Sequence, residues 1–327
     1  MIGGRTVRAL AIAALAALLV GACSSSAASS GAAAGGKLQV VATTTVFADL
    51  AAQVGGDKVE AVSLVPKGGD VHTFDPKPSD VRRLAAAAVV LRNGLGLDDW
   101  LSKLVADAGS KATVVALGEN LEGVQYIEGE SGQPNPHVWM NVAYAAKYVD
   151  RIQAALAAAD PANASAYAAN ATAYKGKLAT LDADIKARLG AIPEANRVVV
   201  SFHDAFPYYA AAYGLTVVGT IVDAPGQDPS AGQIADLVGK IKASGAKAIF
   251  AEAQFNDALA QAISKETGAT VVYDLYDDTL GDPPQDTYLA IMAWNTDKVV
   301  GRSAAADGFP RADRPGRRSQ DDRLVRA

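Results

Sequence analysis

Short apolar runs and longer stretches with helical periodicity alternate along the chain from residue 38 to residue 300. The short runs are apolar at consecutive positions, which is typical of strands that are buried on both faces. This alternation predicts an α/β fold in which helices cover both faces of parallel sheets. Strands are predicted at 38–42, 59–65, 88–91, 112–117, 197–201, 215–220, 246–250 and 270–273. Helices are predicted at 46–54, from 78, 98–106, from 141, 161–190, 205–213, 230–243, 257–267 and 285–300.

One predicted helix is much longer than the others and divides the pattern into two halves. It begins at Pro161, a residue that suits the first turn of a helix. Its apolar side chains recur at intervals of three, four and seven and form a single stripe. The stripe consists of Tyr167, Tyr174, Leu178, Leu181, Ile185 and Leu189. We therefore expect two Rossmann-like lobes with parallel sheets, an N-terminal lobe at 37–160 and a C-terminal lobe at 193–301, joined by a connecting helix at 161–192.

The first 22 residues have the pattern of an export signal. Arg5 and Arg8 precede an apolar run that is shorter than the roughly 20 residues of a membrane span. The run ends in small residues before Cys23, so residues 1–22 are predicted to be a lipoprotein signal peptide and Cys23 the lipidated first residue of the mature chain. The alternative is an ordinary secretory signal with an incidental Cys. Residues 23–36 are rich in Ser, Ala and Gly, which predicts a flexible tether.

The composition narrows the class of protein further. Half of the 327 residues are hydrophobic and 20% are charged, so the chain can bury a large core. The formal net charge of −5 offers no basic face, and we expect no nucleic-acid partner. Cys23 is the only Cys, so the folded part has no disulfide and would hold a metal ion through imidazole and carboxylate groups. Residues 302–327 contain seven Arg and four Asp without apolar periodicity, and we expect a disordered basic tail there.

The chain has only three histidines, and each lies in a loop or beside a strand end. His72 follows a Gly-rich loop, His137 follows Asn135 and Pro136, and His203 comes directly after a predicted strand. A single histidine is most often an ordinary surface or core residue. Here none of the three lies on a helix face, and open α/β sheets bind ligands beyond the carboxyl ends of their strands. We therefore predict that the three side chains form one metal site between the lobes.

A carboxylate is expected to complete this site. Asp278 is the favoured residue, although Asp274 and Asp277 lie in the same segment and are open alternatives. Three imidazoles and one carboxylate match the ligands of tetrahedral zinc. Glu252, at the end of a predicted strand, is a candidate partner that orients a ligating imidazole, or else a surface carboxylate. Trp139 is predicted to line the site, or else to pack in the core.

Other chemistry has little support in the sequence. The glycines at 94 and 96 do not form a phosphate loop or a dinucleotide fingerprint, and there is no Gly-x-Ser-x-Gly motif. One enzymatic alternative stays open, because a zinc hydrolase can hold its metal with three histidines and a water molecule. If Asp278 takes the fourth position, no activated water remains. The protein is therefore expected not to be an enzyme.

Several segments, taken in order and spacing, give the chain a family resemblance from about Leu38 to Val300. The segments are Gly69–Pro76, Pro78–Asp80, Asn93–Leu97, Asn135–Trp139, Phe202–Phe206, Tyr213–Leu215, Glu252–Phe255 and Asp278–Gly281. With these motifs the chain resembles the metal-binding lipoproteins that supply zinc and manganese ABC importers, known as cluster A-I or solute-binding protein family 9. The resemblance implies two α/β lobes joined by a long rigid helix, with the metal in the cleft between them. It also implies His72, His137, His203 and Asp278 as the ligands.

The resemblance carries further expectations about cargo and partners. The third ligand of this family is often Glu in manganese-type members and His in zinc-type members, so His203 favours Zn²⁺, while Mn²⁺ remains the alternative. A monomeric protein is implied, anchored through Cys23 at the outer face of the cytoplasmic membrane. It would deliver the ion to a permease that a cytoplasmic ATPase powers. Relatives have also been given a cell-adhesion role, which nothing in this sequence supports or excludes.

The chain departs from the family pattern in two places. Many zinc-specific relatives carry a long His- and Asp-rich loop before the second histidine. The corresponding loop here, residues 118–136, is short and contains no His, which puts a metal-collecting role of this loop in doubt. The segment 302–327 has no counterpart that we recognise in the family.

Overall fold

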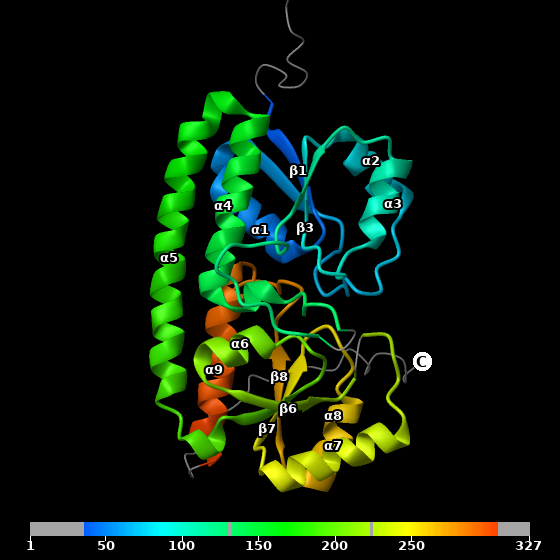
Figure 1. The fold of residues 1–327 in the computed structure, drawn as a ribbon, viewed down its shortest axis with the longest axis vertical. Helices are drawn as coiled ribbons and strands as arrows, with labels where there is room; N and C mark the ends of the chain where they lie inside the picture. Colours follow the sequence, from blue (N-terminus) through cyan, green and yellow to red (C-terminus); the bar gives the residue numbers. More distant parts are fainter. Residues whose placement is uncertain (1–35, 130–131, 223–224, 307–327) are drawn as a thin grey trace, which may run out of the picture. The chain divides into compact units, whose positions relative to one another are not determined.

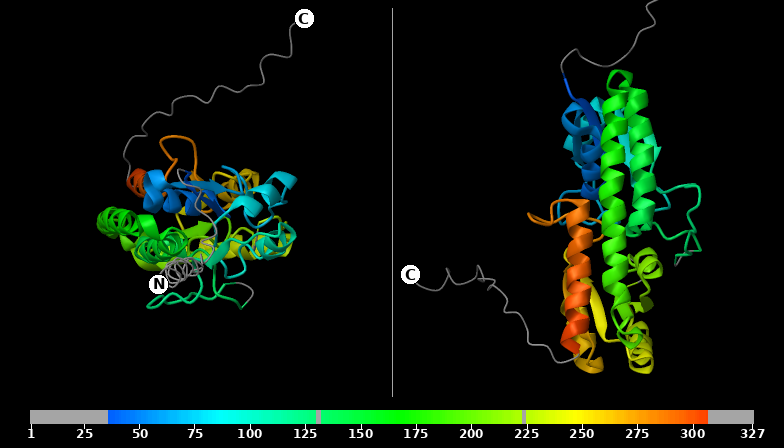
Figure 2. Two further views of the ribbon diagram at one scale, coloured as in Figure 1. Left: turned by 90° about the horizontal axis from the view of Figure 1, so that it is seen from above. Right: turned by 90° about the vertical axis from the view of Figure 1, so that its left-hand side faces the viewer.

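The computed structural model describes residues 36–129, 132–222 and 225–306. The predicted signal peptide, Cys23 and nearly all of the predicted tether lie outside these residues. The described residues from Lys37 onward form one compact unit, drawn in Figure 1 and from two further directions in Figure 2. In the part of the chain that the structure describes, no helix combines the length and the apolar character that crossing a lipid bilayer requires.

The N-terminal lobe contains a four-stranded sheet in which all neighbouring strands are parallel. The strand order is β2-β1-β3-β4. The strands are β1 (Leu38–Ala42), β2 (Val59–Ser63), β3 (Val89–Arg92) and β4 (Thr113–Ala116). The helices of this lobe are α1 (Thr45–Gly55), α2 (Pro78–Ala86), α3 (Trp100–Asp107) and α4 (Val142–Ala159).

The C-terminal lobe repeats this plan with a second parallel sheet of order β6-β5-β7-β8. Its strands are β5 (Val198–Ser201), β6 (Thr216–Thr220), β7 (Ala248–Glu252) and β8 (Thr270–Leu275). Its helices are α6 (Pro207–Tyr213), α7 (Ala231–Ser244), α8 (Ala258–Thr267) and α9 (Tyr288–Ala306). Short 3-10 turns lie at η1 (Gly56–Lys58), η2 (Val138–Met140), η3 (Pro161–Asn163) and η4 (Glu194–Asn196). The predicted α/β class with two parallel sheets is confirmed.

Alternating side chains of the strands explain why both faces of each sheet are covered. In β1, Val40 and Ala42 belong to the core under α1 and α4, whereas Val41 belongs to a separate core under α2 and α3. In β7, Phe250 points to the core shared with α6 and α9, and Ile249 to the core under α7 and α8. Because successive residues of a strand face opposite sides, a strand buried on both faces must be apolar at consecutive positions.

The long helix α5 (Ala164–Gly190) connects the lobes and packs against helices of both. It contacts α1 and α4 of the N-terminal lobe and α6 and α9 of the C-terminal lobe, and Figure 1 shows it running along both sheets. Five of the six residues of the predicted stripe are buried, and Leu181 is partly buried. The first turn at Pro161 is a separate 3-10 turn, so α5 begins at Ala164. The stripe forms part of one core that extends through both lobes.

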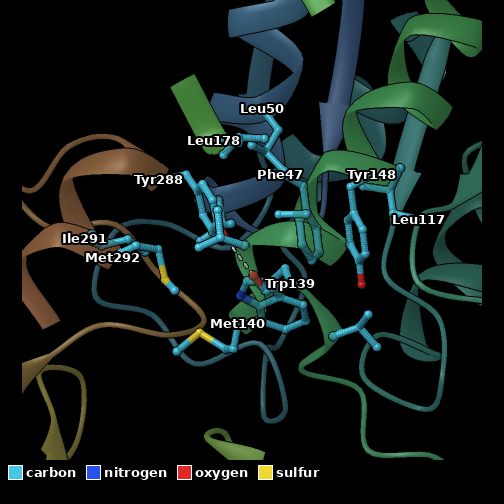
Figure 3. Close-up of a cluster of buried hydrophobic side chains, with 14 of the residues drawn as sticks. Phe47, Leu50, Leu117, Trp139, Met140, Tyr148, Leu178, Tyr288, Ile291 and Met292 are labelled. Atoms are coloured by element: carbon cyan, nitrogen blue, oxygen red, sulfur yellow. Dashed lines mark hydrogen bonds between the residues drawn. The ribbon is translucent and has the colours of Figure 1, made fainter. Parts of the chain in front are cut away.

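A group of large side chains lies at the centre of this common core (Figure 3). Trp139 is fully buried, and its ring meets that of Phe47 edge to face with 5.1 Å between centroids. Tyr288 at the start of α9 donates a hydrogen bond from its hydroxyl to the backbone oxygen of Trp139 at 2.6 Å. The segment that follows His137 is thereby fixed against a helix of the other lobe.

The structure differs from the sequence prediction at the end of the chain. Helix α9 continues to Ala306, six residues beyond the predicted end at Val300. The first five residues of the segment 302–327, for which we predicted disorder, are therefore helical. The remainder of that segment, from residue 307, lies outside the described residues.

Candidate metal centre

The four predicted ligands come from four different loops and from both lobes. His72 lies in the loop between β2 and α2, and His137 lies directly before η2. His203 follows β5, and Asp278 follows β8. Three of these loops leave the carboxyl ends of parallel strands, where open α/β sheets bind their ligands.

The structure brings all four side chains together. The Nε2 atom of His72 lies 3.3 Å from Oδ2 of Asp278, and Nε2 of His137 lies 3.4 Å from Oδ1 of the same carboxylate. The Nε2 atom of His203 lies 3.7 Å from Oδ2 of Asp278. One ligand atom from each residue lies within 4.8 Å of every other. Ligands bound tetrahedrally to zinc at about 2.1 Å would be about 3.4 Å apart, so the cluster has nearly the size that a zinc ion needs.

The cluster is almost entirely buried. The side chains of His137, His203 and Asp278 are 0–3% exposed, whereas that of His72 is 19% exposed. His72 is therefore the member through which the site meets the surface, and we expect an ion to enter on that side.

Many polar atoms of the cluster have no hydrogen-bond partner among the described residues. Buried atoms in this condition are rare in proteins and require an explanation. They include the Nε2 atoms of all three histidines and both carboxylate oxygens of Asp278. Among the described residues, the hydroxyl of Tyr174 is the only buried polar atom without a hydrogen-bond partner that lies away from the cluster and its immediate neighbours. A cation bound among these atoms would satisfy them together.

Three neighbouring side chains lie beside the Nδ1 atoms of two of the imidazole rings. The Nδ1 atom of His137 lies 3.1 Å from Oδ1 of Asn135, an oxygen that can only accept. Nδ1 is therefore the protonated nitrogen of that ring, and the lone pair of Nε2 is free for a ligand. On the other side of the cluster, Nδ1 of His203 lies 3.5 Å from Oε1 of Glu252 and 3.7 Å from Oδ2 of Asp277. Both carboxylates are buried, and His203 lies between them and Asp278.

Burial and charge act on these groups in opposite directions. Burial alone would lower the pKa of His203, but the close approach of the Glu252 side chain and the charges of Asp277, Glu252 and Asp278 outweigh it and raise the pKa to about 10. Burial lowers the pKa of His137 despite the attraction of Asp278. Burial would raise the pKa of Asp278, but His137 and His72 hold it well below its ordinary value. The cluster thus combines an ionised carboxylate with a histidine that binds its proton strongly.

The three aspartates of the segment after β8 have different surroundings. Asp278 faces all three histidines. Asp277 accepts hydrogen bonds at Oδ1 from Nε2 of Gln254 and from the backbone N–H of Asp278, both at 2.6 Å. Asp274 belongs to β8, and its carboxylate lies 3.9 Å from Nζ of Lys298. The geometry therefore favours Asp278 as the ligand and makes Asp277 a neighbour of His203.

Trp139 and Glu252 both lie next to the cluster. The ring of Trp139 is 5.3 Å from that of His137 between centroids, and its Nε1 donates to the backbone oxygen of Asp277 at 3.1 Å. It is at the same time a fully buried core residue. Glu252 is buried and is not a surface carboxylate. The sequence reasoning did not assign Asn135 a role, although its place two residues before His137 was a signal.

The family model that matches this chain is described as "Zinc-uptake complex component A periplasmic" and spans residues 40–301. Among the relatives, the iron ABC transporter substrate-binding lipoprotein MtsA of Streptococcus pyogenes is 33% identical over 273 residues, which cover 80% of this chain and 88% of that protein. The metal ABC transporter substrate-binding lipoprotein SsaB of Streptococcus sanguinis is 31% identical, with the same coverage.

This chain is also similar to solved structures. The periplasmic zinc-binding protein TroA of Treponema pallidum has a TM-score of 0.76 and 26% identity, with 82% of this chain and 99% of that chain covered. The Mn-bound periplasmic metal-binding protein of Candidatus Liberibacter asiaticus has a TM-score of 0.74 and 26% identity, with 82% and 100% covered. The matched family is named for zinc uptake, and MtsA and SsaB are named as substrate-binding lipoproteins of ABC transporters. The prediction of a transport protein that is not an enzyme is thereby confirmed.

Proposed function

The chain belongs to the family of periplasmic zinc-uptake complex components, which makes it a metal-binding protein of an ABC transporter, and on this premise we propose that its cargo is Zn²⁺. It captures the ion outside the cytoplasmic membrane and hands it to the permease of an importer that a cytoplasmic ATPase drives. The named relatives are associated with different metals, iron for MtsA and zinc for TroA, so the choice of zinc rests on the donor set of this chain.

One observation carries the proposal. Four side chains far apart in the sequence converge on one buried point, and three imidazole Nε2 atoms face the same carboxylate at 3.3–3.7 Å. We propose His72, His137 and His203 as nitrogen ligands and Asp278 as the oxygen ligand. Three neutral nitrogen donors and one carboxylate suit zinc, whereas harder ions prefer a set with more oxygen. Glu252 is proposed to orient His203, and Trp139 to hold His137 and the Asp278 loop in place.

Manganese is the second candidate, for a specific reason. The two oxygens of Asp278 face different histidines, Oδ1 towards His137 and Oδ2 towards His72 and His203. A carboxylate in this position is able to bind through both oxygens and to raise the coordination number above four. Mn²⁺ accepts this more readily than Zn²⁺, which favours four ligands in closed sites.

The hydrolase alternative fails on the position of Asp278. A catalytic zinc site keeps one position for water. Here the carboxylate occupies the fourth side of the cluster, at 3.3–3.7 Å from each imidazole. The family assignment agrees with this conclusion.

Calorimetric titration of metal-stripped protein tests the proposal. Zn²⁺ should bind with one ion per chain, and His137→Ala and Asp278→Asn should each lose most of the affinity. Asp107→Asn is the matched control, since Asp107 is exposed and forms an ion pair with Lys103 on α3. A competition titration with Mn²⁺ decides between the two ions. Unchanged zinc binding by His137→Ala would remove the basis of the site.

The membrane anchor and the oligomeric state are proposals of the same kind. The relatives are named lipoproteins, and Cys23 follows a signal-like segment, so we propose that lipid on Cys23 holds the protein at the outer face of the cytoplasmic membrane. Cys23→Ser should move the protein from the membrane fraction to the soluble fraction. A monomer is proposed because Val114 is the only large hydrophobic side chain that is exposed among the described residues, at 41%. Light scattering should give the mass of one chain.

A further inference from the structure

The loop that carries Asp278 belongs to the C-terminal lobe by sequence but is hydrogen-bonded to the N-terminal lobe on both sides of the carboxylate. Before Asp278, the backbone oxygen of Asp277 accepts from Nε1 of Trp139 at 3.1 Å. After it, Oγ1 of Thr279 accepts from the backbone N–H of Gly68 at 2.9 Å, in the loop that presents His72. The backbone N–H of Leu280 donates to Oγ1 of Thr45 at 2.8 Å.

Thr45 and Thr279 form the centre of this contact. Their Oγ1 atoms lie 3.4 Å apart, and Oγ1 of Thr279 also lies 3.2 Å from the backbone oxygen of Leu280. One arrangement of the two hydroxyl protons gives every donor and acceptor in this contact a partner. The hydroxyl of Thr45 donates to Thr279, the hydroxyl of Thr279 donates to the Leu280 carbonyl, and each hydroxyl accepts one backbone N–H. Thr279 is buried, whereas Thr45 is partly buried and Gly68 is exposed, so the hydroxyl of Thr279 is the part of the contact that is best shielded from water.

The position of the two threonines links this contact to the metal site. Thr279 is adjacent to Asp278, and Gly68 lies in the same loop as His72. Thr45 is the first residue of α1. One turn later in α1, Oδ2 of Asp49 accepts a hydrogen bond from the backbone N–H of Tyr288 in the C-terminal lobe at 2.8 Å. Tyr288 in turn bonds to the backbone oxygen of Trp139, as Figure 3 shows. The Asp278 loop is therefore fixed to the lobe that supplies His72 and His137.

We propose that Thr45 and Thr279 are positioning residues that form a latch between the lobes and set the rate at which the bound ion leaves. The latch, defined by Thr45, Gly68, Thr279 and Leu280, holds the carboxylate of Asp278 against the two histidines of the N-terminal lobe. An ion coordinated by Asp278 leaves only when this loop moves away, and that motion breaks the hydrogen bonds of the latch. This inference rests on the proposed binding of a divalent metal ion but not on the choice between zinc and manganese.

Thr45→Val and Thr279→Val test the latch, because valine keeps the shape and removes the hydroxyl. The metal-loaded protein is mixed with excess chelator, and the rate of metal loss is followed. Each variant removes at least two hydrogen bonds of the latch and should lose the ion at least about tenfold faster, since a factor of ten corresponds to about one hydrogen bond of ordinary strength. The rate of metal association should change little, since the ligands and the charges of the site are unaltered. Thr279→Ser keeps the hydroxyl and should restore the slow rate.

The control is Thr296→Val, which removes another buried threonine hydroxyl between two helices of the C-terminal lobe, where it contacts Tyr209. This variant should lose thermal stability to a similar extent and release metal at the unaltered rate. Equal release rates for Thr279→Val and the unaltered chain would overturn the latch, as would equal acceleration by Thr296→Val. Binding of Zn²⁺ and Mn²⁺ to the unaltered chain is measured first. Failure of both ions to bind would refute the proposed function and the latch together, whereas normal binding with unchanged release refutes the latch alone.

Discussion

The Nδ1 atom of His203 and the Oε1 atom of Glu252 face each other at 3.5 Å in the interior of the C-terminal lobe. Both side chains are buried, and Glu252 ends β7 while His203 follows the neighbouring strand β5. A carboxylate in this position keeps the proton of the imidazole on Nδ1 and leaves the lone pair of Nε2 directed at the metal centre. It also makes the imidazole a stronger donor to a metal ion.

Glu252→Gln should therefore weaken metal binding without removing a ligand. Loss of such a partner costs about 10–100-fold in affinity in known metal sites. Competition against a chelator of known affinity measures the change. Glu266→Gln is the control, because Glu266 is an exposed residue that pairs with Lys242. Wild-type affinity in Glu252→Gln would mean that His203 is oriented by Asp277 or by packing alone.

Metal binding should depend on pH well above the ordinary titration range of histidine. Burial alone would lower the pKa of His203, but Glu252, Asp277 and Asp278 raise it to about 10. An imidazole must be neutral to bind a metal ion, so at neutral pH the ion has to displace a proton from His203. Because this pKa lies above the working pH, the apparent affinity should increase about tenfold per pH unit between pH 6 and 8.

The same displaced proton can be counted directly. Calorimetric titration at pH 7 in two buffers of different ionisation enthalpy should show the release of about one proton per ion bound. An affinity that is constant above pH 7, with no proton release, would show that His203 is neutral in the metal-free chain. That result would fit an unshifted histidine pKa of about 6.5.

The fold was predictable because its physical requirements are local. A strand buried on both faces needs consecutive apolar residues, as Val40 and Val41 of β1 illustrate. The stripe of α5 needs apolar residues at helical spacing, and Leu178 and Ile185 satisfy it. The end of α9 was predicted too early because apolar periodicity stops near Val300, while the alanines at 304–306 keep a high helix propensity.

The residue types of the candidate site could be predicted from the sequence, but the choice between neighbouring carboxylates could not. Three histidines in loops or beside strand ends formed a recognisable set. Which of the adjacent residues Asp277 and Asp278 faces the histidines depends on the loop after β8, which Trp139, Gly68 and Thr45 fix from the other lobe. Contacts of this kind join residues more than 130 positions apart, and no local pattern reveals them.

The choice between zinc and manganese should respond to His203. Replacing it by glutamate gives the site a second carboxylate ligand, and the affinity for Zn²⁺ relative to Mn²⁺ should fall by about tenfold or more. Competition titrations with both ions measure this ratio. His203→Gln is the matched control, since it removes the imidazole without adding charge. A ratio that is equal in both variants would show that ligand charge at this position does not set the preference.

The His203→Glu substitution should also lower the stability of the metal-free protein. A glutamate at position 203 would lie beside the buried carboxylates of Glu252, Asp277 and Asp278. Like charges in a buried site repel one another and disfavour ionisation. Metal-free His203→Glu should therefore unfold at a lower temperature than metal-free His203→Gln, and a divalent ion should restore more stability to the glutamate variant. Equal melting temperatures would indicate that one of the carboxyl groups takes up a proton instead.

Metal should also stabilise the folded chain, because the ligands come together only in the native structure. An ion at 1,000 times its dissociation constant adds about 4 kcal/mol to the free energy of unfolding. In a chain of this size such a gain raises the melting temperature by on the order of 10 °C. Scanning calorimetry of the stripped protein with and without Zn²⁺ measures it. His137→Ala should show little of the increase, whereas Asp107→Asn should show all of it. An equal increase in both variants would place the stabilising ion outside the cluster of His72, His137, His203 and Asp278.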